Sequence, residues 1–216
     1  MYLNRAVLPF SLSVMVLLSL SGCIGGSTPM SQFYLLEPIH NSDNKTAFVQ
    51  AKLPIALAPV RIPKYADRPQ IVSATAQNTY QLSELNRWAE ALDENMTRVL
   101  MENLSLLVPA EVQLTNTSNL AKQAKYRIAL SVLEFHVDPK GQAKLNAQWD
   151  VTQDGKKLSS QQMSYQSPAS TFNYRVMVTA LNECLSNLSR DIATSLRQLD
   201  DAEKNQSTSK KAALPS

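Results

Sequence analysis

The sequence is poor in the residues that usually bind metals or form disulfides. It has only two histidines and two cysteines in 216 residues. His40 falls in a polar stretch and His136 stands beside Phe135 at the end of a predicted strand, and neither has a second histidine or cysteine at metal-ligand spacing. We therefore expect no metal and no other cofactor. Two cysteines allow at most one internal disulfide, so the hydrophobic core must supply most of the stability.

Glycine is also scarce, with five residues, and Gly25-Gly26 form the only pair, so no phosphate-binding glycine loop is predicted. There is no G-x-S-x-G motif, and the adjacent carboxylates at 93–94 and 200–201 are expected to be solvated. An enzyme is not predicted, although a triad assembled from distant serine, aspartate and His136 stays open as a tethered hydrolase. The net charge of +3 without a dense basic cluster argues against nucleic acid as a partner.

What the chain does contain begins with an export signal. Arg5 precedes an uncharged apolar run at residues 6–20, which is short for a transmembrane helix. The run ends in Leu20-Ser21-Gly22-Cys23, which resembles the lipobox of bacterial lipoproteins. That resemblance implies removal of residues 1–22, acylation of Cys23 and a membrane anchor of several acyl chains, with residues 23–31 as a tether. An ordinary secretory signal with an incidental cysteine is the alternative.

The residue after Cys23 indicates the destination of such a lipoprotein. Ile24 stands where lipoproteins retained at the inner membrane commonly carry aspartate. By this family rule, we expect the protein at the periplasmic face of the outer membrane.

Between residues 32 and 199 the pattern predicts a single α+β domain. Strands are predicted at 32–36, 55–62, 70–72, near 111–114, and at 126–137, 143–151 and 158–166, the last polar enough for a sheet edge. The apolar alternation of the strand at 126–137 changes face near Leu133, which favours a bulge there or burial of both faces. Asp154-Gly155 predicts a tight hairpin.

Two long amphipathic helices are predicted. The first starts after a Ser83 cap and carries an apolar stripe to residue 107 that includes Leu85 and Trp88. The second spans about 173–199 and buries Cys184 as a small apolar side chain. We expect both helices to pack on one face of a mainly antiparallel or mixed sheet. The polar composition of residues 200–216 predicts a disordered tail.

Several stretches together resemble PqiC/YmbA-type ABC-type transport auxiliary lipoproteins. They are Phe33-Tyr34-Leu35-Leu36, the segment from Ile62-Pro63-Lys64-Tyr65-Ala66-Asp67-Arg68-Pro69 to Val72, the segment Asn86-Arg87-Trp88-Ala89-Glu90-Ala91-Leu92, and the strand containing Trp149. Ala66 and Ala91 depart from the pattern, where bulkier residues or proline are expected. The resemblance implies an outer-membrane lipoprotein that forms homo-oligomers and docks an MCE-domain protein of PqiB type, linked to an inner-membrane permease. Such systems move lipid between membranes and support envelope integrity.

The loop between Pro63 and Pro69 is the candidate partner-binding site. Lys64, Tyr65, Asp67 and Arg68 lie there, and tyrosine and arginine are enriched at the energetic centres of interfaces. The alternative is a structural ion pair in which Asp67 and Arg68 bind each other or Glu90. Trp88, Glu90 and Trp149 are predicted to be structural. A freestanding carrier of lipid or another apolar ligand is the alternative function, and it requires an internal pocket.

Overall fold

The computed structural model describes residues 29–40, 53–115 and 119–212. The described residues from Ser31 onward form one compact unit, which contains an eight-stranded mixed sheet. The predicted signal peptide and Cys23 lie outside the described residues. None of the helices formed by the described residues combines the length and apolar character that a transmembrane segment requires.

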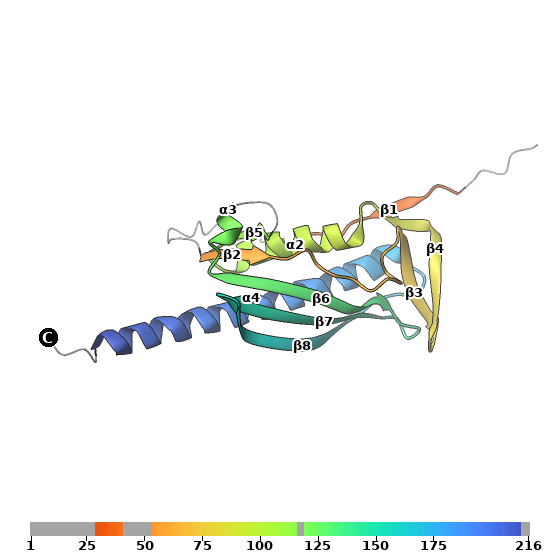
Figure 1. The fold of residues 1–216 in the computed structure, drawn as a ribbon. Helices are drawn as coiled ribbons and strands as arrows, with labels where there is room; N and C mark the ends of the chain where they lie inside the picture. The colour runs from red at the N-terminus through yellow and green to blue at the C-terminus, as the bar shows by residue number, and fades with distance from the viewer. Residues whose placement is uncertain (1–28, 41–52, 116–118, 213–216) are drawn as a thin grey trace, which may run out of the picture. The chain divides into compact units, whose positions relative to one another are not determined.

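The sheet is built around β6, as Figure 1 shows. On one side, β6 (Tyr126–Val137) pairs with β7 (Gln142–Gln153), which pairs with β8 (Lys156–Pro168). The three strands form an antiparallel meander. The turn between β7 and β8 has positive φ at Asp154 and Gly155, as predicted from the Asp-Gly pair. Among the described strands β8 pairs only with β7, and it is the polar edge strand that the sequence predicted.

The other side of β6 is shared by two groups of strands. β2 (Leu53–Leu57) runs parallel to the start of β6 and carries β5 (Ala110–Leu114) on its far side. β3 (Gln70–Ala76) is parallel to the end of β6, and it pairs with β4 (Thr79–Trp88), which pairs with β1 (Gln32–Tyr34). Two separate groups of strands therefore pair with the two ends of β6, and we call the place where these groups diverge the fork. The connection from β2 to β3 crosses it.

The helices cover one face of the sheet, as predicted. α2 (Leu92–Leu107) and α4 (Tyr174–Ala212) pack against each other, and α4 also contacts β6, β7 and β8; a short α3 (Asn119–Lys122) precedes β6. The core between helices and sheet is formed by inward-facing side chains such as Leu130, Leu145, Trp149, Val151, Leu185, Leu188, Ile192 and Leu196. The predicted change of face in β6 is a bulge, because its register with β7 shifts between Val132 and Glu134 and leaves Leu133 exposed.

The start of the first helix was predicted wrongly. Residues 84–88 belong to β4, and α2 begins only at Leu92, after Ala91. The Ser83 hydroxyl accepts the Asn86 N–H at 3.0 Å, a contact resembling a helix cap, but the two residues lie where the β3–β4 register shifts. Pairing of β4 with both β1 and β3 outweighs the local helical pattern, because those partners supply the backbone hydrogen bonds.

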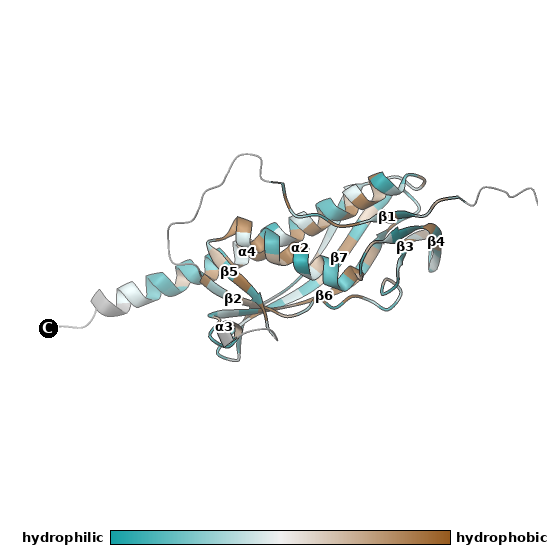
Figure 2. Ribbon diagram, turned by 90° about the horizontal axis from the view of Figure 1, so that it is seen from above, coloured by the Kyte–Doolittle hydropathy of each residue, from teal (hydrophilic) through white to brown (hydrophobic). Residues whose placement is uncertain are grey.

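The predicted disorder of the C-terminal tail is also corrected, since α4 continues to Ala212 (Figures 1 and 2). Ion pairs hold the first turn of α4 beyond residue 199. Lys125 Nζ lies 2.6 Å from Asp200 and 2.9 Å from Glu203, and Asp200 also pairs with Lys204 at 2.6 Å. These pairs and helix-favouring Ala, Glu, Gln and Lys residues extend the helix beyond the sheet. Residues 213–216 lie outside the described part of the chain.

Candidate partner-binding loop

The candidate loop, residues 62–69, lies at the fork in the sheet. After β2 the chain follows β6, where Arg61 N–H donates to Leu130 O and Val132 N–H donates to Arg61 O. The chain then leaves β6 and re-enters the sheet as β3 at Gln70. The loop therefore bridges two groups of strands that do not otherwise pair, which explains why its conformation is determined by contacts distant in sequence.

Backbone hydrogen bonds fix both ends of the loop. Pro63 O accepts the N–H groups of Ala66 at 2.9 Å and Asp67 at 3.2 Å, forming a turn that buries the Ala66 methyl group. At the other end, Pro69 O accepts the Trp88 N–H of β4 at 2.7 Å. The turn is thus closed by its prolines, as the sequence indicated, and Ala66 fits where a larger side chain would meet the core.

Tyr65 anchors the centre of the loop rather than projecting into solvent. Its hydroxyl accepts the Phe135 N–H at 2.8 Å and lies 3.4 Å from His136 Nδ1. Its ring stacks on Tyr80 with centroids 5.0 Å apart, and Tyr80 meets the His136 ring edge-on at 5.3 Å. Burial raises the pKa of Tyr65 to about 12 and lowers that of His136, so both groups are neutral at neutral pH.

The charged residues of the loop face solvent. Lys64 Nζ pairs with Asp67 at 2.8 Å, and hydrogen bonding to that carboxylate raises the pKa of Lys64. The exposed Arg68 makes no side-chain ion pair or hydrogen bond with any other residue that the structure describes. The alternative of a structural ion pair between Arg68 and either Asp67 or Glu90 is wrong, because Asp67 binds Lys64 and Glu90 binds Arg98 at 2.6 Å.

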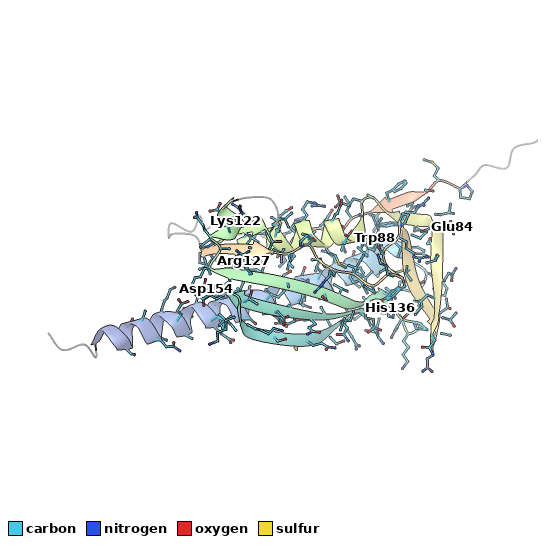
Figure 3. All side chains as sticks on the ribbon, in the orientation of Figure 1. Glu84, Trp88, Lys122, Arg127, His136 and Asp154 are labelled. Atoms are coloured by element: carbon cyan, nitrogen blue, oxygen red, sulfur yellow. The ribbon has the colours of Figure 1, made fainter. Side chains whose placement is uncertain are left out.

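The three residues predicted to be structural take different positions. Trp88 is buried, with its ring 6.3 Å from that of Phe135, at the same end of the sheet as His136 in Figure 3. Trp149 is fully buried on β7, and its indole N–H has no partner among the described residues. Glu90 is at the surface, in the pair with Arg98.

Sequence reasoning missed three asparagines that hold the segment after β1. Asn95 Oδ1 accepts the Leu36 N–H at 2.7 Å and its Nδ2 donates to Leu36 O at 3.1 Å. Asn103 accepts the Ile39 N–H at 2.8 Å, and Asn182 accepts the N–H of residue 37 at 2.9 Å. Asn95 and Asn103 are buried on α2. Polar amides on an otherwise apolar helix stripe were the available signal, because buried amides require partners.

Two further features bear on the alternatives considered from sequence. Cys184 is buried, and burial raises the pKa of its thiol to about 12, so it is an apolar core residue rather than a reactive thiol. A surface groove of about 600 Å³ lies between α2 and the end of β5, lined by Pro59, Asp93, Glu94, Thr97, Arg98, Met101, Glu102 and Leu114.

The geometry defines the class of the protein as a single α+β domain, with two long helices on one sheet face and a rigid loop that presents charges to solvent. Residues 34–193 match the family described as the ABC-type transport auxiliary lipoprotein component. The chain belongs to this family, which confirms the resemblance inferred from the motifs. It is a family of membrane-anchored transport auxiliaries and not a family of enzymes.

Individual relatives agree with this assignment. The chain is 23% identical over 180 residues to the intermembrane transport lipoprotein PqiC of Escherichia coli, covering 83% of this chain and 93% of that protein. A PqiC from Shigella flexneri matches equally. Among solved structures, an uncharacterized protein (TM-score 0.65, 19% identity) covers 78% of this chain and 99% of its own. A Xanthomonas campestris protein (TM-score 0.64, 15% identity) covers 80% and 99%. The two structures confirm the fold.

Proposed function

We propose that this protein is a lipid-anchored subunit of an MCE-type intermembrane lipid transport system, held at the periplasmic face of the outer membrane through Cys23. In this role it acts as the docking base for an MCE-domain partner connected to an inner-membrane permease. It works as a homo-oligomer and supports envelope integrity. Similarity to PqiC along most of both chains supports an intermembrane role.

The observation that carries the docking role is the rigid, charged loop. Tyr65 and the backbone contacts hold residues 62–69 in one conformation before any partner binds, which lowers the entropic cost of association. The guanidinium of Arg68, which has no side-chain partner among the described residues, and the exposed Lys64–Asp67 pair then offer polar contacts to a protein surface. Because Tyr65 is committed to the fold, we assign recognition to Lys64, Asp67 and Arg68.

Photo-crosslinking in cells tests the docking role. A photoreactive amino acid replaces Arg68 in one strain and Lys156 in the control strain; both positions are exposed, and Lys156 lies in the β7–β8 hairpin. We expect an MCE-domain protein to be crosslinked from position 68 and not from position 156. Equal crosslinking from both positions, or none from position 68 in membranes that contain the partner, contradicts the proposal.

The anchor is tested by Cys23→Ala. We expect the unsubstituted protein to sediment with outer-membrane vesicles and the variant to appear folded in the aqueous fraction, because Cys23 precedes the compact unit that starts at Ser31. An unsubstituted protein that sediments with the inner membrane refutes the outer-membrane location alone. Light scattering of the detergent-extracted protein tests the homo-oligomer, and a monomeric mass refutes it.

The surface groove beside α2 is the candidate site for the alternative of a freestanding carrier, since Pro59, Met101 and Leu114 give it an apolar lining, but it is open to solvent and is not the internal pocket that a carrier requires. Its acidic rim of Asp93, Glu94 and Glu102 disfavours an anionic lipid. Mass spectrometry of the protein purified from cells distinguishes the two functions, because a carrier retains a stoichiometric lipid besides its own acyl chains.

A further inference from the structure

Four exposed apolar side chains gather where the domain meets its tether, and we call them the anchor-side patch: Phe33, Leu35, Phe172 and Val176. Phe172 is 93% exposed, Phe33 64%, Leu35 42% and Val176 41%. Two shallow depressions bring the two chain segments together at Arg175, which lines both: Phe33 and Leu35 line one and Phe172 lines the other.

Phe172 is held outward by a built turn. The Ser170 hydroxyl accepts the N–H groups of Phe172 at 3.1 Å and Asn173 at 3.0 Å. Asn173 Oδ1 in turn accepts the Val176 N–H at 3.3 Å, which caps the start of α4. The hydrogen bonds hold the backbone at Phe172, so little backbone conformational entropy is lost when its exposed ring is covered, and the position is suited to contact with an apolar medium.

We propose that the anchor-side patch rests in the interfacial region of the bilayer that holds the acyl chains, with Arg175 on lipid phosphate. This rests on the proposed anchoring at Cys23. Eight residues lie between Cys23 and Gln32, so even a fully extended tether of nine steps keeps the start of β1 within about 30 Å of the membrane surface. Phenylalanine and leucine side chains insert at the boundary between headgroups and acyl chains, and arginine forms charge-assisted hydrogen bonds with phosphate.

The tether makes a small patch sufficient. Because the domain is confined near the surface, contact with lipid is effectively intramolecular, and an affinity too weak for a free protein still gives a well-populated contact. Four side chains are far fewer than the 20–30 residues per side of a stable protein interface, which favours lipid over a second protein. Arg175 and Glu37 are the only charged residues among those lining the two depressions.

Quenching of a site-specific fluorophore tests the contact. The full chain is extracted with its native anchor and reconstituted in phosphatidylethanolamine–phosphatidylglycerol vesicles containing nitroxide-labelled lipid. Single thiols are introduced by Leu35→Cys or Phe172→Cys, and by Leu106→Cys as the control. Leu35 and Leu106 are both 42% exposed, but Leu106 lies at the far end of α2 from the contact with Leu36. Buried Cys184 contributes only the background measured on unsubstituted protein.

We expect probes at positions 35 and 172 to be quenched several-fold more by the nitroxide lipid than the probe at position 106, and less by aqueous iodide. Nitroxide quenching equal to that at position 106 overturns the proposal. Protection from both the nitroxide lipid and iodide also overturns it, because this result indicates that another protein covers the patch. If the protein fails to float with vesicles, the anchoring proposal fails instead. The patch is then tested in the Cys23→Ala chain. There Phe33→Ser with Phe172→Ser is expected to reduce vesicle partitioning by about tenfold relative to Leu106→Ser, and no reduction refutes the contact.

Discussion

Replacing Asn95 by alanine should destabilise the domain more than its single side chain suggests. Asn95 is 1% exposed and satisfies both the N–H and the carbonyl of Leu36, which is itself buried. Alanine leaves both backbone groups without a partner, and each unsatisfied buried group costs about 1–3 kcal/mol. The expected loss of unfolding free energy is therefore about 2–6 kcal/mol, a large part of the 5–15 kcal/mol typical of a domain.

Asn182→Ala is the matched control. Asn182 accepts a single N–H, that of the exposed residue 37, and water replaces this bond at little cost. We expect a loss below about 1 kcal/mol for the control, since only one solvent-accessible hydrogen bond is removed. The two substitutions delete the same atoms from facing helices, so their difference isolates burial of the Leu36 backbone.

Urea unfolding of both variants in the Cys23→Ala background gives the comparison, and hydrogen exchange at the Leu36 amide reports the site directly. We expect the Leu36 amide to exchange faster in Asn95→Ala than in Asn182→Ala, with an unchanged dependence of free energy on urea. The reasoning is refuted if Asn95→Ala costs no more than Asn182→Ala, because then the Leu36 backbone either finds water or was never desolvated.

Three further predictions concern the loop and the ionisable groups. Tyr65→Phe should lower the unfolding free energy by about 1 kcal/mol, because the Phe135 amide of β6 loses its acceptor. Tyr80→Phe keeps the ring stacked on Tyr65 and should leave the unfolding free energy unchanged. Thermal melting of the two variants measures the difference. Burial opposes ionisation of Asp200, but hydrogen bonds from Lys125 and its helix neighbour outweigh it and lower the carboxyl pKa. A carboxylate with a lowered pKa stabilises the fold above the unfolded value, so the advantage of the unsubstituted protein over Lys125→Met should shrink as pH falls below about 4. Urea titrations at pH 6 and pH 3 measure the difference in unfolding free energy between the two proteins. A difference that is the same at both pH values contradicts the ion pair. Burial lowers the pKa of His136, so the unfolded chain binds the proton more readily. Stability should therefore fall below about pH 6.5 by an amount that His136→Gln removes, and identical pH profiles contradict this.

The meander of β6, β7 and β8 could be predicted because its determinants are local. Alternating side chains fix the buried face of β7, Asp154-Gly155 fixes the turn, and the break in alternation at Leu133 marks the bulge. Each signal lies within a few residues of the feature it determines. The same holds for the apolar stripes of α2 and α4, which require a single covered face.

The remaining features depend on partners far away in the chain. Residues 84–88 carry helix-compatible spacing, and pairing with β3 and with β1, which lies some 50 residues earlier, makes them a strand. Asn95 finds its partner 59 residues away, and Tyr65 reaches Phe135 70 residues away. Lys64, Asp67 and Arg68 could be predicted as a surface because charge and proline are local signals. The role of Tyr65 as an internal anchor could not, since nothing in the loop itself specifies that β6 lies beneath it.

The position of the loop relative to the anchor-side patch constrains how a partner can reach it. Gln70, next to the loop, pairs with Arg87, and Arg87 pairs with Phe33, so the loop and the patch are separated by two strand spacings, about 10 Å. A domain that rests on the bilayer through Phe33 therefore presents Arg68 close to the membrane surface, while α4 carries the chain toward the opposite end of the sheet (Figure 1). A partner that binds the loop must extend past the domain to the bilayer itself. Crosslinks from Arg68 to the partner and lipid quenching at Phe172 are then expected in the same molecule, and partner binding that abolishes the lipid contact would show that the two surfaces compete.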